Sequence, residues 1–291
     1  MRRRSLYHLG ILLLCFFIGA CGKREEMFTK NNDDNKDILT KTEDKNIDEI
    51  DTPRDDVATN MFMEGENMKS NKYDEVHLYP AGRIIDVSEF DNEMIDSMFV
   101  SQELSSEIVK RIEGKSYKEG ADIPLRDLRY IRVLHRGFDG KTHIGEMIVN
   151  KAIALDVIDI FKELYRISYP IEKMLLIDEY DADDIKSMED NNSSAFNYRY
   201  IEGTNKRSVH SDGLAIDINP LYNPYVRTRN GKTEVLPESG LEYTDRNLDN
   251  EYYIKKGDPC YEAFISRGFT WGGEWKNSKD YQHFEKKLAQ E

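Results

Sequence analysis

Ser208-Val-His-Ser-Asp-Gly-Leu-Ala-Ile-Asp217 combines a turn with the start of a short strand. The run 214–218 alternates in the manner of a strand that has two different faces. One face carries Ala215, Asp217 and Asn219, and the other buries Leu214, Ile216 and Ile218. Glycine tolerates a positive φ, so Gly213 permits a turn that returns His210 to the neighbourhood of Asp217.

A second polar motif, Asp280-Tyr-Gln-His283-Phe-Glu285, lies close to the end of the sequence. Two imidazoles and one carboxylate are a common ligand set for catalytic zinc, which keeps a fourth position open for water. We therefore expect His210, Asp217 and His283 to bind one metal ion. Asp280 supplies a carboxylate three residues before the last ligand, and Glu274 is a rival candidate for the acid/base.

The same residue types also form the ligand triad of non-haem iron oxygenases. Those enzymes usually place the histidine and the acid one residue apart on a strand, whereas His210 and Asp217 are seven positions apart. The spacing favours zinc, and iron is the alternative that metal analysis tests.

Composition limits the class of protein. The 291 residues allow one large domain or two small ones. A net charge of −14 argues against nucleic acid or an anionic membrane surface as the main partner, because both require basic patches.

The first residues predict export. A basic start at 1–4 precedes an apolar run at 9–20 that is too short to span a bilayer comfortably, which indicates a signal peptide over residues 1–20. The sequence Ile18-Gly-Ala-Cys21 resembles the lipobox of bacterial lipoproteins, which implies a lipid-modified Cys21. The alternative is an ordinary signal peptide with a chance cysteine. We expect a protein outside the cytoplasm, attached to a bacterial membrane through its lipid alone.

Residues 21–70 are charged and poor in aromatic residues, which predicts a disordered tether. A folded domain is expected over residues 71–291. Its patterns predict helices at 91–112, 153–164 and 261–267, and strands at 128–134, 143–149, 174–177 and 214–218, with a final strand near the end. Helices and strands do not alternate, so the predicted class is α+β, with a mainly antiparallel central sheet and flanking helices.

Four segments together resemble the zinc D-alanyl-D-alanine carboxypeptidase family, which includes D,D-dipeptidases, L,D- and D,D-carboxypeptidases and endolysin peptidases. They are residues 187–199, Ser208-x-His-x-x-Gly-x-Ala-x-Asp217, Trp271-Gly-Gly and Asp280-x-x-His283-Phe-Glu285. With the upstream stretch 135–150, the resemblance covers roughly residues 125–288. It implies a Hedgehog/D-Ala-D-Ala-peptidase-like fold.

The resemblance also implies roles for individual residues. His210, Asp217 and His283 correspond to the ligands of one Zn²⁺, and Asp280 corresponds to the general base. Arg199 corresponds to the residue that polarises the scissile carbonyl or holds a substrate carboxylate. Ser208 is expected to support the site and the substrate by hydrogen bonding.

Other residues near these motifs have open roles. The expected alternatives for Tyr222, Tyr225 and Trp271 are a substrate cleft or the core, and Cys260 is expected to be inert. Residues 226–258 form an insertion between the second and third ligands that is expected to cap the cleft.

The implied function is hydrolysis of peptidoglycan stem peptides by a monomeric zinc metallopeptidase, with removal of a C-terminal D-alanine as the first expectation. An L-alanyl-D-glutamate endopeptidase is the alternative within the family. A non-catalytic peptidoglycan-binding or assembly module on the same scaffold is the alternative outside it.

Overall fold

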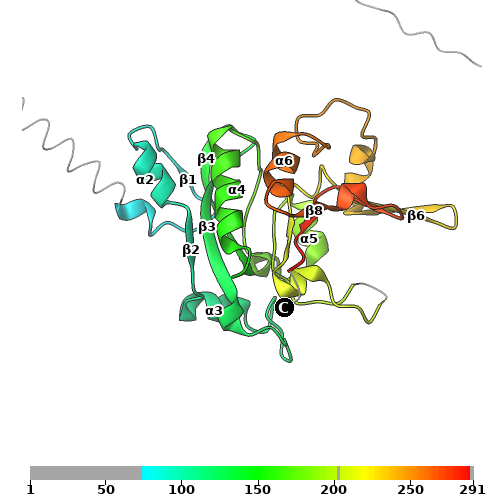
Figure 1. Ribbon diagram of the computed structural model, residues 1–291, viewed down its shortest axis with the longest axis horizontal. Coiled ribbons are helices and arrows are strands. Elements are labelled where there is room, and N and C mark those ends of the chain that lie inside the picture. Colours follow the sequence, from blue (N-terminus) through cyan, green and yellow to red (C-terminus); the bar gives the residue numbers. More distant parts are fainter. Residues whose placement is uncertain (1–73, 202–203, 289–291) are drawn as a thin grey trace, which may run out of the picture. The chain divides into compact units, whose positions relative to one another are not determined.

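The computed structural model describes residues 74–201 and 204–288 (Figure 1). The predicted signal peptide, the lipidated Cys21 and the tether at 21–70 lie outside these residues. Within the described part of the chain, no helix is long and apolar enough to cross a membrane.

A four-stranded antiparallel sheet forms the first half of the domain. Its order is β1 (Ile84–Ile85), β4 (Thr142–Asn150), β3 (Leu128–Arg136) and β2 (Val100–Gln102). The long hairpin β3–β4 matches the two strands predicted from the sequence, and its turn contains Gly140 at a φ of 71°.

Successive side chains of β3 point to opposite faces of the sheet. Both faces are buried, because each is covered by a helix. Helix α4 (Ala154–Arg166) covers one face, where it packs against residues such as Ile131 and Val133 (Figure 1). On the other face, the helix α3 (Ser106–Ile112) forms a second cluster with residues that include Tyr130 and Phe196.

The single helix predicted over residues 91–112 is wrong. The segment folds as α2 (Asn92–Ser97), strand β2 and α3. The side chain of Asp91 accepts a hydrogen bond from the Met94 N–H, and Ser105 accepts one from the Ile108 N–H, so each begins its own helix. Between them, β2 gains backbone hydrogen bonds by pairing with β3, which helical spacing does not reveal.

The strand predicted at 174–177 is also absent. The side chain of Asn192 takes the place of a partner strand, since its Oδ1 accepts from the Leu175 N–H at 2.8 Å and its Nδ2 donates to the Leu175 carbonyl at 3.1 Å. The chain then enters the 3-10 helix η2 (Ile177–Tyr180) and the helix α5 (Asp184–Glu189).

Two further antiparallel sheets make up the second half of the domain. The strands β5 (Ala215–Asp217), β10 (His283–Glu285) and β8 (Thr270–Trp271) form one, and β7 (Lys232–Leu236), β6 (Tyr225–Arg229) and β9 (Lys279–Asp280) form the other. Four short helices belong to the same half: η3 (Val209–Asp212), which precedes β5, and η4 (Glu238–Thr244), α6 (Pro259–Ile265) and η5 (Gly272–Glu274), which lie between the strands.

The mixed helical and antiparallel character agrees with the α+β prediction. The strands divide among three antiparallel sheets, and the candidate ligands lie outside the largest one. The Hedgehog/D-Ala-D-Ala-peptidase-like topology stays a prediction.

Candidate metal centre

The pairing of β5 with β10 places His283 directly opposite Asp217. Directly opposed residues of an antiparallel pair carry their side chains on the same face of the sheet. The Nδ1 atom of His283 accordingly lies 3.0 Å from Oδ1 of Asp217. Ala215 lies opposite Glu285 on the same face, so the neighbouring position on β5 is filled by a small side chain.

His210 comes from the helix η3, whose two ends are fixed by the residues that flank it. The Ser208 hydroxyl oxygen accepts a hydrogen bond from the His210 N–H at 3.3 Å. Gly213 closes the helix with a φ of 64° and donates its N–H to the His210 carbonyl. A Cβ atom at Gly213 would lie 2.7 Å from the backbone nitrogen of Asn150, so the turn requires glycine, as its sequence position predicts.

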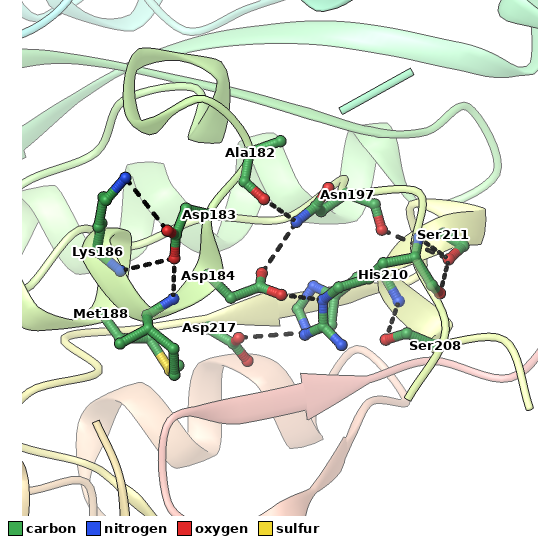
Figure 2. A network of polar contacts seen from close by, with 12 residues as sticks. Ala182, Asp183, Asp184, Lys186, Met188, Asn197, Ser208, His210, Ser211 and Asp217 are labelled. Atoms are coloured by element: carbon green, nitrogen blue, oxygen red, sulfur yellow. Dashed lines mark hydrogen bonds and ion pairs between the residues drawn. The ribbon is translucent and has the colours of Figure 1, made fainter. Parts of the chain in front are cut away.

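The three predicted ligands converge on one point. Nε2 of His210 lies 3.2 Å from Nδ1 of His283. It also lies 3.3 Å from Oδ2 of Asp217, whose side chain is drawn beside His210 in Figure 2. The three candidate ligand atoms all lie within 4.8 Å of one another. Separations of this size fit three corners of a tetrahedral zinc site, with a fourth corner for water.

Each imidazole is oriented by a partner on its far side. Nδ1 of His210 donates to the Ala195 carbonyl at 2.6 Å, which directs Nε2 toward Asp217. Nε2 of His283 lies 3.5 Å from Oε2 of Glu285, which directs Nδ1 toward the same point. Outer partners of this kind are typical of histidines that bind a metal. The sequence did not indicate that the Ala195 carbonyl and Glu285 orient the two imidazoles. Glu285 follows His283 by two positions on a strand, so a shared face was the available signal.

Electrostatics couple the cluster. Burial alone would raise the pKa of Asp217, but attraction to His210 and hydrogen bonds to both imidazoles lower it below its usual range. Burial would lower the pKa of His283, but hydrogen bonds to Asp217 and Glu285 and attraction to the carboxylates raise it to about 10. A cation at the centre would take the place of the proton that the cluster holds. Two imidazoles and one carboxylate around Zn²⁺ leave a net charge of +1, so the donor set fits zinc.

Asp280 lies on β9 at the edge of this cluster. Its Oδ1 is buried and accepts no hydrogen bond within the described residues. Burial raises its pKa to about 6, with attraction to His283 opposing and repulsion from Asp217 adding to the shift. A Cβ atom at Gly272 would lie 2.6 Å from the Asp280 carbonyl, which explains the need for glycine after Trp271. The rival candidate Glu274 instead forms an exposed ion pair with Lys256 at 2.7 Å.

Arg199 is held by a carboxylate that sequence analysis missed. Its Nε forms an ion pair with Oδ2 of Asp184, from the first turn of α5. Asp184 in turn accepts from Nδ2 of Asn197 at 3.0 Å (Figure 2). The Ser211 hydroxyl accepts from the Arg199 N–H at 2.9 Å and donates to the Arg199 carbonyl at 2.7 Å, so the backbone beside η3 is fixed as well. Asp184 belongs to a run of acidic residues, and no local signal distinguishes it from its neighbours.

The aromatic candidates separate into three environments. Trp271 is buried in the core and donates its indole N–H to the Tyr281 carbonyl at 2.8 Å. Tyr222 packs against the rings of Phe138 and Tyr252. Tyr225 lies opposite Asp280 in the β6–β9 pair. Cys260 is fully buried, and burial raises the pKa of its thiol well above the usual value, which agrees with an inert role.

Of the comparisons with known proteins, a match to one protein family supports the site. No curated protein and no solved structure matches the chain. The sequence profile of a family described as D-alanyl-D-alanine carboxypeptidase matches residues 202–286. This range contains all three candidate ligands, Ser208 and Asp280, whereas Arg199 lies just before it. Over residues 202–286, the chain is therefore similar to the D-alanyl-D-alanine carboxypeptidase family of peptidases.

Proposed function

We propose that this protein is a zinc-dependent peptidoglycan peptidase that removes a C-terminal D-alanine from stem peptides. The observation that carries the proposal is the convergence of His210, Asp217 and His283 beside the buried carboxylate of Asp280. A metal with an open position next to a general base is the arrangement with which metallopeptidases hydrolyse peptide bonds.

The chemistry divides between the ligands and the residues around them. Zinc, when bound, supplies a Lewis acid and lowers the pKa of a bound water to about 7. Asp280 accepts the proton of the attacking water and then delivers it to the amine of the leaving D-alanine, which balances the proton over one turnover. Its free, buried Oδ1 suits this double role. Arg199, fixed by Asp184, stabilises the negative charge that develops on the carbonyl oxygen.

Recognition of a free C-terminal carboxylate requires a cation near the cleft. The sequence offers Arg199 and the pair Lys206-Arg207. Arg207 forms ion pairs with two carboxylates, Asp122 and Asp212, whereas Arg199 pairs with Asp184 alone, so less of the Arg199 charge is compensated. We therefore assign carboxylate recognition to Arg199, with Lys206 as the second candidate.

We further propose that the protein works as a monomer outside the cytoplasm, anchored through lipid on Cys21 and extended by residues 21–70. Such an anchor would hold the peptidase within reach of the cell wall. Mass spectrometry of the mature N-terminus tests this directly. An acylated Cys21 is expected, and an unmodified residue at that position would contradict the anchor.

Defined muropeptides distinguish the candidate reactions. The purified, zinc-loaded chain is incubated with stem peptides, and the products are identified by mass spectrometry. Loss of one terminal alanine supports the carboxypeptidase. Cleavage between L-alanine and D-glutamate supports the endopeptidase, and no product from a fully zinc-loaded protein supports a non-catalytic binding module.

A further inference from the structure

The insertion at 226–258 begins beside Asp280. Tyr225, the residue just before it, is the first residue of β6 and lies directly opposite Asp280 in the antiparallel β6–β9 pair. Opposed side chains in such a pair lie on the same face, with Cβ atoms about 4.5–5.5 Å apart. Tyr225 is partly exposed, and its hydroxyl makes no hydrogen bond within residues 74–201 and 204–288. A free phenol therefore lies next to the candidate general base.

A partly buried arginine, Arg246, connects the insertion to the residues just before Tyr225. Arg246 donates to the carbonyls of Tyr222 and Ile254 at 2.9 Å each, and to Oδ1 of Asn223 at 2.9 Å. Its guanidinium also lies 4.4 Å from the ring centre of Tyr281, the residue that follows Asp280. The acceptors of Arg246 are uncharged carbonyl and amide oxygens. Its planar guanidinium connects three segments, at residues 222–223, 254 and 281.

Asn223 completes this connection. It is fully buried, and its Nδ2 donates to the carbonyls of Asn219 and Tyr252, while its Oδ1 also accepts from the Ile254 N–H at 2.8 Å. The segment that follows β5 is therefore connected through Asn223 to the far end of the insertion. The insertion is therefore hydrogen-bonded to the chain that precedes it.

We propose that Tyr225 is a substrate-positioning residue of the peptidase and that Arg246 holds it in place. This inference rests on the proposed function and deepens it. The Tyr225 hydroxyl donates a hydrogen bond to a carbonyl or carboxylate oxygen of the stem peptide, next to the bond that is cleaved. Its ring packs against a small apolar side chain, such as the methyl group of alanine.

The first test uses Tyr225→Phe and Tyr225→Ala, with Tyr252→Phe as a control in the same insertion. Loss of one hydrogen bond corresponds to roughly a tenfold change, so Tyr225→Phe is expected to raise KM about tenfold on an alanine-terminated muropeptide. Zinc content and melting temperature should stay at the wild-type values, as should the kinetics of the control. Values of kcat and KM within twofold of the wild type for both Tyr225 variants would overturn the inference.

A binding measurement keeps this inference separate from the proposed function. If the zinc-loaded wild type cleaves no muropeptide, the peptidase proposal fails. Calorimetric titration with the same muropeptide then decides the role of Tyr225, because weaker binding by Tyr225→Ala supports it and equal binding contradicts it.

The second test concerns Arg246. Arg246→Lys keeps the charge but loses the planar fork, so KM is expected to rise as in Tyr225→Phe. The double variant should be little worse than Tyr225→Phe alone, since both changes remove the same contact. Effects on KM that multiply in full would show that Arg246 does not act through Tyr225.

Discussion

Nδ1 of His283 lies 3.0 Å from Oδ1 of Asp217, and the two residues face each other across the β5–β10 pair. In the metal-free protein, this contact makes the imidazole strongly basic. Metal ions bind the neutral imidazole, so a proton and zinc compete for the same nitrogen.

Zinc binding is therefore expected to release about one proton near pH 8. The pKa of His283 is raised to about 10, because the hydrogen bonds to Asp217 and Glu285 outweigh the effect of burial. Calorimetric titration of the metal-free protein with zinc, in buffers of different ionisation enthalpy, measures the release. Glu285→Gln should release less. A release near zero for the wild type would contradict the protonated state of His283.

Asp280→Asn is expected to reduce kcat by about 10² to 10⁴, the usual contribution of a general acid/base. Zinc content should be unchanged, because Asp280 is absent from the group of ligand atoms that lie close together. Metal analysis beside the kinetics separates the two roles. His283→Ala should lose metal and activity together, and loss of metal from Asp280→Asn would contradict the assignment.

Gly213→Ala is expected to destabilise the fold by about 3 kcal/mol and to weaken zinc binding. Alanine at a φ of 64° is strained, and its Cβ would lie 2.7 Å from the Asn150 nitrogen, so η3 must shift with His210. Gly231→Ala is the matched control, because Gly231 has a φ of 72° but no atom within 4 Å of the added carbon. It should cost about 1 kcal/mol and leave zinc affinity intact. Urea unfolding and zinc titration of both variants provide the comparison, and equal losses would show that the contact with Asn150 is unimportant.

We expect the protein to lose stability in acid because of His135. It is buried, donates Nδ1–H to the Ile171 carbonyl at 2.8 Å, and has its pKa lowered to about 4 by burial. The unfolded chain binds the proton below about pH 6.5, so this stability is present above that pH and is lost as the pH falls toward 4. The loss is about 3 kcal/mol, from a shift of about 2.5 pKa units at 1.36 kcal/mol each. Unfolding of the metal-free protein at pH 7 and pH 4.5 should show a smaller drop for His135→Asn than for the wild type, and identical drops would exclude this residue as the cause.

Local patterns predicted the elements that depend on local forces. Alternation identified the β3–β4 hairpin and the strand that ends at Asp217, and spacing identified α4. Gly213 was predicted to form the turn because few residues other than glycine tolerate a positive φ. The prediction of a single helix over residues 91–112 was wrong, because β2 pairs with β3, a strand elsewhere in the sequence.

The sequence alone determined which residues offer ligand chemistry, because imidazole and carboxylate groups at these positions are sufficient to suggest a metal. Only the tertiary structure brought His283 beside Asp217 across 66 positions, and only it placed Asp184 on Arg199 and Tyr225 beside Asp280. The physical reason is that side-chain type and φ preference act within a few residues. Contacts between distant segments depend instead on how all the strands and buried groups pack together.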